Sequence, residues 1–298
     1  MRMRAQVKTR TGMWPGVVLA AALAVPVITV PTIHAQQAPS LEDVRYNMAD
    51  ALGMLRHHGN SPPEEDLMMS VEIYGSARIA EVGPTGVGPL AEVESYYAEI
   101  AYDFPGMRVD VTRASGEREI QVVSGLFAWN EIDERGGGLV EGFGSAEPAM
   151  DAVAERLLRI WMTPAGAVKM AVAAGDQATV SMEGGAVVVT FPLVNAPMTR
   201  STNLTAGPLE GTQMKVTLDD ASRPAKVEVE HGGSQIVNTY SGYADLNESD
   251  YQADIFLPAN IMRTIDGQTV LDLTIERTNT YNPYVIMPVP DSVRSAAQ

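Results

Sequence analysis

The chain has 298 residues, a formal net charge of −16 and no cysteine. Without thiols it can form neither disulfides nor thiolate metal sites, and it lacks the cysteine through which exported lipoproteins are anchored. An acidic surface repels the phosphate backbone of nucleic acids, because these are bound through lysine and arginine. We therefore expect no nucleic-acid partner and no attraction to an anionic membrane surface.

Residues 1–35 have the pattern of a secretory signal peptide. Four cations open the chain, an apolar run follows from Val17 to Val30, and Ala35 offers a small residue for cleavage. The run is shorter than the roughly 20 residues that span a bilayer, and Pro26 interrupts it, so cleavage is favoured over an uncleaved membrane anchor. Losing the four cations moves the formal charge from −16 to −20. We expect an exported, periplasmic protein with one domain over residues 36–298 and no stable membrane anchor.

An amphipathic helix is predicted near the start of that domain. Ser40 followed by Asp43 forms a capping box, and apolar residues then recur at helical spacing from Leu41 to Leu55. His57 and His58 follow in the last turn, where a cation meets the negative end of the helix dipole. A metal site is disfavoured because the pair lacks a third ligand and its members point in different directions.

The rest of the chain alternates with the period of β-strands. Short alternating runs recur between residues 69 and 131 and again between residues 178 and 276, with turn residues between them. The clearest hairpin joins 256–265 to 269–276 through Asp266 and Gly267. We predict a mainly β (α+β) fold: a single curved antiparallel sheet or half-barrel of about eleven strands, with the N-terminal helix and a central helical elbow on its concave side.

The helical elbow interrupts the strands between residues 153 and 175. Its first helix has a broad apolar face and a narrow polar stripe that contains a Glu155–Arg159 pair at i,i+4. Thr163 then caps a second helix that begins at Pro164. We interpret the elbow as a fixed plug over the sheet, with a lid displaced by a ligand as the alternative.

Catalytic patterns are missing from the sequence. It contains no G-x-S-x-G and no H-E-x-x-H motif, and residues 231–234 fit a hairpin turn better than an oxyanion hole. Acidic loops at 131–134, 219–220 and 245–250 could collect calcium, but solvated loops are the simpler interpretation. We therefore expect no enzyme activity, no metal and no cofactor.

Large apolar and aromatic side chains are the candidates for ligand contact. They could line a pocket for an apolar ligand, although aromatic residues in strands more often belong to the core. The candidate ligand-binding residues are Tyr97, Trp129, Leu157, Trp161, Tyr240 and Phe256.

Several phrases, taken together and in order, resemble a known protein region. They are "AEIAYDFPGMRVDVTR", "REIQVVSGLFAWNE", "AVAERLLRIWMTPAGAVKMA" and "FLPANIMRTIDGQTVLDLTIERTNTYNPYVIMPVPDSVR". The region they resemble precedes the catalytic domain in exported bacterial metallo-β-lactamase-fold hydrolases. The resemblance implies an accessory domain without chemistry of its own and a shape similar to the LolA/LolB half-barrel. The metal ligands of the hydrolase domain have no counterparts in this sequence, so no hydrolase activity is implied.

Three functions follow as hypotheses. The first is a non-enzymatic exported binding or carrier module for an apolar small molecule or lipid. The second is a stand-alone accessory domain that docks onto another envelope protein or hydrolase. The third is an uncharacterised enzyme that uses the acidic loops.

Overall fold

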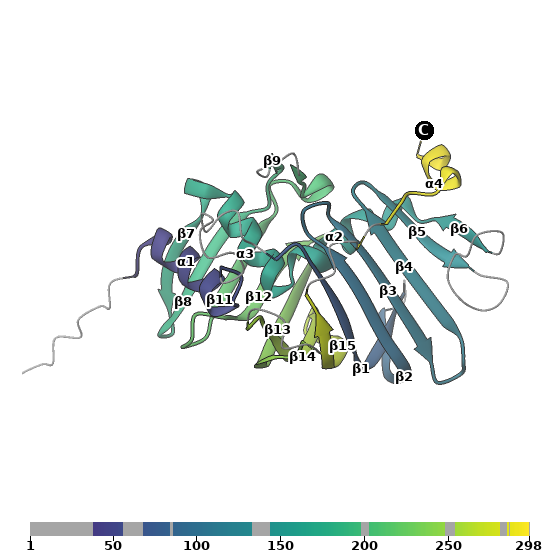
Figure 1. Cartoon of the computed structure of the whole chain (residues 1–298), viewed down its shortest axis with the longest axis horizontal. Coiled ribbons are helices and arrows are strands. Elements are labelled where there is room, and N and C mark those ends of the chain that lie inside the picture. Colours follow the sequence, from purple (N-terminus) through teal and green to yellow (C-terminus); the bar gives the residue numbers. More distant parts are fainter. Residues whose placement is uncertain are drawn as a thin grey trace, which may run out of the picture. The chain divides into compact units, whose positions relative to one another are not determined.

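The computed structural model describes residues 38–55, 68–83, 86–132, 144–197, 203–247, 254–280, 285 and 287–297 (Figure 1). The predicted signal peptide, His57 and His58 lie outside these ranges, as do parts of the acidic loops at 131–134 and 245–250.

A single antiparallel sheet of thirteen strands organises the described chain. Its order is β6-β5-β4-β3-β2-β1-β15-β14-β13-β12-β11-β8-β7. The strands of this sheet are β1 Ser70–Gly83, β2 Gly86–Ala101, β3 Gly106–Arg113, β4 Arg118–Ser124, β5 Phe127–Ile132, β6 Ser145–Pro148, β7 Thr179–Glu183, β8 Ala186–Pro192, β11 Gln213–Leu218, β12 Pro224–His231, β13 Ser234–Asp245, β14 Phe256–Ile265 and β15 Gln268–Asn279. Two short strands, β9 Ala196–Pro197 and β10 Asn203–Leu204, pair with each other separately.

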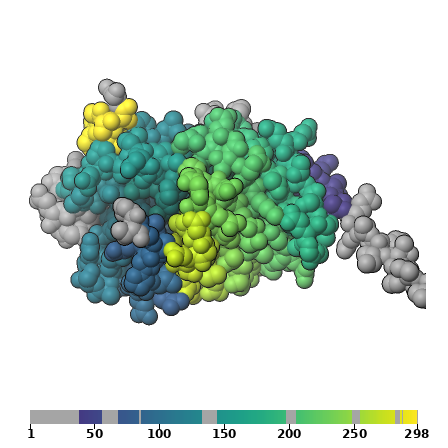
Figure 2. Space-filling view, turned by 180° about the vertical axis from the view of Figure 1, so that it is seen from behind, coloured from purple at the N-terminus to yellow at the C-terminus, as the bar shows by residue number. Residues whose placement is uncertain are grey.

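The fold class agrees with the prediction, and the strand count is higher than expected. The strand that sequence alternation does not reveal is β6, whose four residues are mostly exposed and carry no apolar pattern. Pairing of β15 with β1 joins the last strand of the chain to the first, at the middle of the sheet. From behind, the yellow-green surface of β15 accordingly lies between the blue surface of the first strands and the green surface of the later ones (Figure 2).

The β14–β15 hairpin confirms the sequence prediction and fixes which side chains face inward. Asp266 and Gly267 both have positive φ, 50° and 79°, as a two-residue hairpin turn requires. The register places Ile261 opposite Leu273 and Arg263 opposite Leu271. Because side chains alternate between faces, these four residues share one face of the sheet.

Four α-helices complete the described chain, and three of them belong to the main apolar core. They are α1 Leu41–Ala51, α2 Val153–Trp161, α3 Pro164–Ala173 and α4 Asp291–Ala296, with 3₁₀ turns at Met150–Ala152, Gly175–Gln177 and Gly207–Leu209. Helix α2 lies against β3, β4 and β5, whereas α3 lies against α1 and β8. Ser40 caps α1 as predicted, since its side chain accepts a hydrogen bond from the Asp43 amide and donates one to the Asp43 carboxylate.

The elbow between α2 and α3 forms as its sequence predicts. The Thr163 hydroxyl accepts a hydrogen bond from the Gly166 amide at 3.1 Å, and Pro164 opens α3. A side chain at position 166 would lie 2.2 Å from the carbonyl oxygen of Ile160, so only glycine allows this close approach. The second helix ends at Ala173, slightly earlier than the sequence suggests.

A buried arginine joins helix α2 to the sheet through hydrogen bonds. Arg156 Nη1 donates to the carbonyl oxygens of Val122 at 2.8 Å and Trp129 at 2.7 Å, and Nη2 donates to Asn130 Oδ1 at 2.6 Å. Only 4% of Arg156 is exposed. Burial and, to a smaller extent, the like charge of Arg159 lower the pKa of this guanidinium to about 10.

A second apolar cluster covers the opposite face of the sheet. Trp129 and Val122 pack there with Met287 and Val293, and the last of these belongs to α4. Figure 1 shows α4 in yellow beside β5 and β6. The segment after β15 therefore returns to cap the outer side of the strands that α2 covers from within.

Candidate ligand pocket

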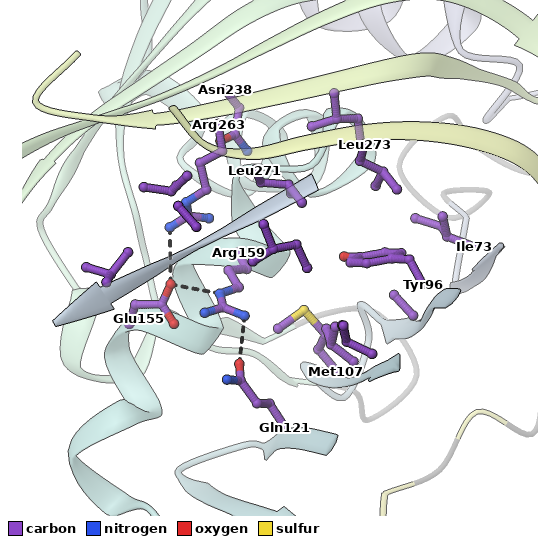
Figure 3. A pocket seen from close by; sticks show the side chains of 18 of the residues that line it. Ile73, Tyr96, Met107, Gln121, Glu155, Arg159, Asn238, Arg263, Leu271 and Leu273 are labelled. Atoms are coloured by element: carbon purple, nitrogen blue, oxygen red, sulfur yellow. Dashed lines mark hydrogen bonds and ion pairs between the residues drawn. The ribbon is translucent and has the colours of Figure 1, made fainter. Parts of the chain in front are cut away.

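A pocket of about 650 Å³ lies between the inner face of the sheet and α2 (Figure 3). Ligand pockets in proteins commonly measure roughly 300–1,000 Å³, so this volume suits one small molecule or one acyl chain. Strands β1 to β4 supply one wall, strands β13 to β15 supply the other, and α2 contributes polar side chains. The sheet must therefore curve, because strands on both sides of its middle face the same cavity.

Aliphatic side chains form most of the wall. Ile79, Ile261, Ile265 and Leu271 are half-buried and line the cavity, so part of their exposed surface faces this space. The deeper lining residues are Ile73, Ala98, Ile100, Met107, Val109 and Val111. These belong to β1, β2 and β3, whose alternation turns every second side chain inward.

One carboxylate and two guanidinium groups stand on this apolar wall. Glu155 Oε1 accepts hydrogen bonds from Arg159 Nε at 2.7 Å and from Arg263 Nη2 at 3.4 Å. Arg159 Nη1 also donates to Gln121 Oε1 at 2.9 Å. Figure 3 shows these contacts joining α2, β4 and β14. We call Glu155, Arg159 and Arg263 the charged triad.

The three side chains of the charged triad stay ionised although burial disfavours their charged forms. Burial raises the pKa of the Glu155 carboxyl, but the two guanidinium groups outweigh this and leave its pKa below the usual value. Burial opposes the charge of Arg159, yet its ion pair with Glu155 raises its pKa. Burial lowers the pKa of Arg263, which Glu155 opposes. Since arginine stays protonated at neutral pH, the triad carries one net positive charge.

A second polar group ties the elbow to the sheet at the pocket's inner end. Tyr240 donates its hydroxyl hydrogen to the carbonyl oxygen of Met162, and Asn238 Nδ2 donates to Tyr240 Oη at 2.9 Å. Tyr102 Oη and Thr163 Oγ1 lie 3.0 Å apart in a further hydrogen bond. Within the described part of the chain, Asn238 Oδ1 is buried without a hydrogen-bond partner.

Three further charged residues, Arg113, Glu119 and Glu81, line the pocket. Arg113 Nη2 and Glu119 Oε2 form an ion pair at 3.1 Å between half-exposed side chains. Glu81 is exposed near the end of β1. Surface ion pairs of this kind contribute about 0–1 kcal/mol to stability.

Of the six predicted site residues, Tyr240 lines the pocket. Leu157 and Trp161 lie on α2 in the main core with no exposed surface, so they support the pocket without lining it. Their helical spacing marks a buried face correctly, but spacing cannot distinguish a core face from a ligand face.

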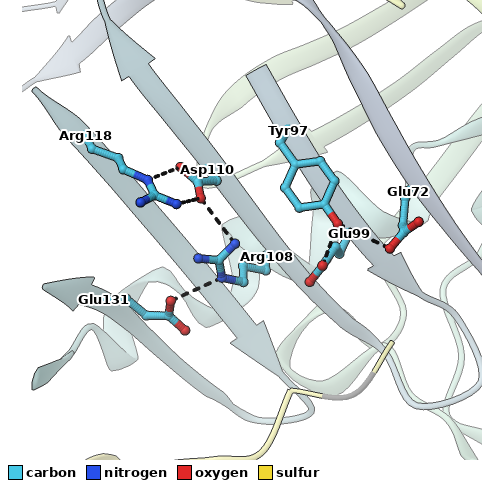
Figure 4. A network of polar contacts seen from close by, with 7 residues as sticks. All are labelled: Glu72, Tyr97, Glu99, Arg108, Asp110, Arg118 and Glu131. Carbon is cyan, nitrogen blue, oxygen red and sulfur yellow. Dashed lines mark hydrogen bonds and ion pairs between the residues drawn. The ribbon is translucent and has the colours of Figure 1, made fainter. Parts of the chain in front are cut away.

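The remaining three predicted residues lie elsewhere. Tyr97 is on the outer face, where its hydroxyl donates to Glu99 at 2.5 Å and contacts Glu72 at 3.3 Å (Figure 4). Trp129 belongs to the outer cluster under α4. Phe256 opens β14 and is not part of the lining. The neighbour Tyr96 faces the pocket instead, because adjacent strand residues point to opposite faces.

The polar residues of the pocket were not predicted as a site. The Glu155–Arg159 pair is visible in the sequence as a helix-surface pair, and Arg263 has the same strand parity as Ile261 and Ile265. An arginine at an inward strand position is the signal that could have indicated the site, since an inward charge needs a partner.

The outer face carries a separate polar network. Arg108 contacts Glu131 at 3.1 Å and Asp110 at 3.3 Å, and Arg118 donates to Asp110 at 2.8 Å (Figure 4). These cross-strand ion pairs join β3, β4 and β5. Cross-strand pairs of opposite charge stabilise a sheet, so this network is structural.

No cluster of three or more potential metal ligands occurs among the described residues. No helix in the same ranges has both the length and the apolar character needed to cross a membrane.

Buried and half-buried tyrosines predict a loss of stability at high pH. Burial raises the pKa of Tyr96, Tyr102, Tyr240 and Tyr243 above the ordinary value of 10.0. The unfolded chain therefore releases these protons at lower pH than the native protein does. Stability contributed by the protonated phenols is complete below about pH 10 and falls as pH rises beyond it. Chemical denaturation at a series of alkaline pH values measures this fall.

The variant Tyr240→Phe is the comparison for this fall in stability with pH. It has one fewer phenol, so its free energy of unfolding should fall less steeply above about pH 10 than that of the unmodified protein. Lys169 titrates in both proteins, and its contribution to the difference therefore cancels. Identical slopes in the two proteins would show that Tyr240 is not protected from ionisation.

Comparison with known proteins leaves the chain without an assigned family. No protein-family model matches it, and no curated protein matches its sequence. Among solved structures it is similar to the Mycobacterium tuberculosis lipoprotein LppX, with 11% sequence identity and a TM-score of 0.25, over 66% of this chain and 90% of that chain. This similarity is too low to transfer a ligand or a function. Neither sequence comparison supports the resemblance to hydrolase accessory regions, which stays a prediction.

Proposed function

We propose that the protein is a non-enzymatic binding or carrier module for an apolar or lipid-like ligand. The observation that supports this is the pocket of about 650 Å³, which has aliphatic walls on both sides of a curved sheet. A soluble protein gains stability by filling such space with its own side chains, so an apolar cavity of this size is typical of a binding site. The signal-peptide pattern favours a place of action in the cell envelope.

The size of the pocket sets the scale of the expected affinity. Burying about ten methylene groups at roughly 0.8 kcal/mol each contributes on the order of 8 kcal/mol before the costs of binding are subtracted. Lost translational and rotational freedom offsets several kcal/mol of that gain. Apolar contacts alone therefore give an affinity weaker than about micromolar, which corresponds to about 8 kcal/mol.

A pocket-filling substitution tests the proposal. Leu271 is half-buried on the inner face, so Leu271→Trp should place an indole in the cavity and weaken binding of an apolar fluorescent probe at least about tenfold, or about 1.4 kcal/mol. Met262 lies on β14, is 41% exposed and points to the outer face, between Ile261 and Arg263. Met262→Trp adds the same indole outside the cavity and should leave probe binding unchanged.

Fluorescence titration of the three proteins gives the answer. Equal probe affinity in the unmodified protein and Leu271→Trp would place any binding elsewhere on the molecule. Failure of the unmodified protein to take up an apolar probe or a long-chain alcohol would contradict the proposed function itself.

A further inference from the structure

The charged triad has hydrogen-bonding capacity that the described protein does not use. A guanidinium group has five N–H donors. Among the described residues, Arg263 makes one hydrogen bond, the 3.4 Å contact with Glu155, and Arg159 makes two, with Glu155 and Gln121. Only 7% of the Arg263 side chain is exposed, and the residue lines the pocket. Its remaining donors therefore need acceptors, and the neighbouring wall is mostly apolar, with Asn238 Oδ1 opposite Arg263 as an unpartnered acceptor among the described residues.

The charged triad also carries a net positive charge, which favours a negatively charged ligand just as its unused N–H donors do. Two cations share one carboxylate, which leaves an excess of one positive charge beside the cavity. Arg156 follows Glu155 on α2 and, within the described ranges, bonds to neutral acceptors only, so its charge adds to the positive potential. Of the other charged lining residues, Glu119 raises the pKa of Arg159 but is itself paired with Arg113, and Glu81 is exposed.

An uncompensated buried cation is costly, and an anion that enters the cavity offsets the cost. Two adjacent guanidinium groups suit a carboxylate, because each presents paired N–H groups that match two oxygen atoms. A monoanion neutralises the single excess charge of the triad itself. The aliphatic walls of β1, β2 and β3 then accommodate the attached chain.

We propose that the pocket binds a single-chain lipid with a carboxylate head, a free fatty acid, whose carboxylate pairs with Arg159 and Arg263. This inference rests on the proposed function and specifies the class of ligand. The acyl chain makes the apolar contacts, and the carboxylate head orients the ligand in the pocket. Glu155 holds the two guanidinium groups in place and also competes with the ligand for them.

The first experiment compares ligands that share one chain. Displacement of a neutral fluorescent probe is measured with palmitate, hexadecanol, hexadecylamine and hexadecyl phosphate. Palmitate should bind at least about tenfold more tightly than hexadecanol, a factor that corresponds to about 1.4 kcal/mol. Hexadecylamine should bind more weakly than the alcohol. Preference for the phosphate over the carboxylate would overturn the assignment of the head group.

Matched variants locate the head group. Arg159→Gln and Arg263→Gln should each reduce the preference for palmitate over hexadecanol severalfold while leaving hexadecanol affinity unchanged. Arg223→Gln removes an arginine that is paired with Asp219 and does not line the pocket, so it should leave the preference intact. Arg263→Lys retains the charge and should keep part of the preference. That result would show that the effect of Arg263→Gln comes from the lost charge and not from a folding defect.

Glu155→Gln gives a result that a purely structural role would not produce. Removing the competing carboxylate leaves two cations, so palmitate affinity should rise severalfold and hexadecanol affinity should not. Equal binding of acid and alcohol, or a preference that survives in both Arg159→Gln and Arg263→Gln, would overturn the inference while the proposed function stands. Absence of binding by every ligand would overturn both.

Discussion

Replacing Trp161 with alanine is expected to lower the free energy of unfolding by about 3–5 kcal/mol. The indole has no exposed surface and ends α2 within the main core. Its removal loses the transfer free energy of a large side chain and leaves a cavity that the neighbouring turn at Thr163 and Pro164 cannot easily fill. A domain of typical stability, about 5–15 kcal/mol, would lose a large share of it.

Chemical denaturation of Trp161→Ala measures this loss, with two further variants for comparison. Trp161→Phe retains most of the buried area and removes an indole N–H that has no partner in the described part of the chain, so it should cost less than the alanine variant. Phe104→Ala removes an aromatic ring that is 70% exposed and should change stability by about 0.5 kcal/mol or less. A loss below about 1 kcal/mol in Trp161→Ala would show that α2 is not held as a fixed plug.

Replacing Asp103 with asparagine is expected to destabilise the protein by about 3–5 kcal/mol. Lys169 on α3 is 1% exposed, and its Nζ lies 2.9 Å from Asp103 Oδ1. Burial lowers the pKa of Lys169, against the attraction of Asp103. Without Asp103 the buried ammonium group has no carboxylate partner among the described residues, which makes the substitution far more costly than loss of a surface ion pair.

Two measurements separate this explanation from a general packing defect. In Lys169→Met both the charge and its need for a partner disappear, so adding Asp103→Asn to that variant should cost little. In Asp103→Asn alone, stability should increase with pH up to about 10.5 more steeply than in the unmodified protein, because loss of the carboxylate lowers the pKa of native Lys169 further. The prediction fails if Asp103→Asn costs the same with and without Lys169.

Local signals in the sequence predict most of the fold because they depend on neighbours along the chain. The capping residues Ser40 and Thr163, the proline at 164 and the Asp266–Gly267 turn each act within a few residues, and all of them form as predicted. Strand β6 was missed because its exposed residues carry no alternation. The pairing of β1 with β15 joins residues about two hundred positions apart, which no local pattern specifies.

The site was harder to predict because it depends on which face of the sheet each side chain occupies and on contacts between residues far apart in the sequence. Tyr97 and Tyr96 are equivalent in composition and adjacent in sequence, yet a single position places one outside the sheet and the other in the pocket. Trp129 shares the outer face with its register partner Val122, and Met287 and Val293 of the distant C-terminal segment cover it there. Glu155 and Arg263 are 108 positions apart, and only the curved sheet brings them into contact.

The account depends most on the pocket as the place where an apolar ligand is held. Native mass spectrometry of protein purified from its native cells tests this directly, with the Leu271→Trp and Met262→Trp variants prepared in the same way. The account predicts one lipid-sized adduct per chain in the unmodified protein and in Met262→Trp, and a strongly reduced adduct in Leu271→Trp. A protein that carries no adduct and takes up none from added palmitate or hexadecanol would contradict it.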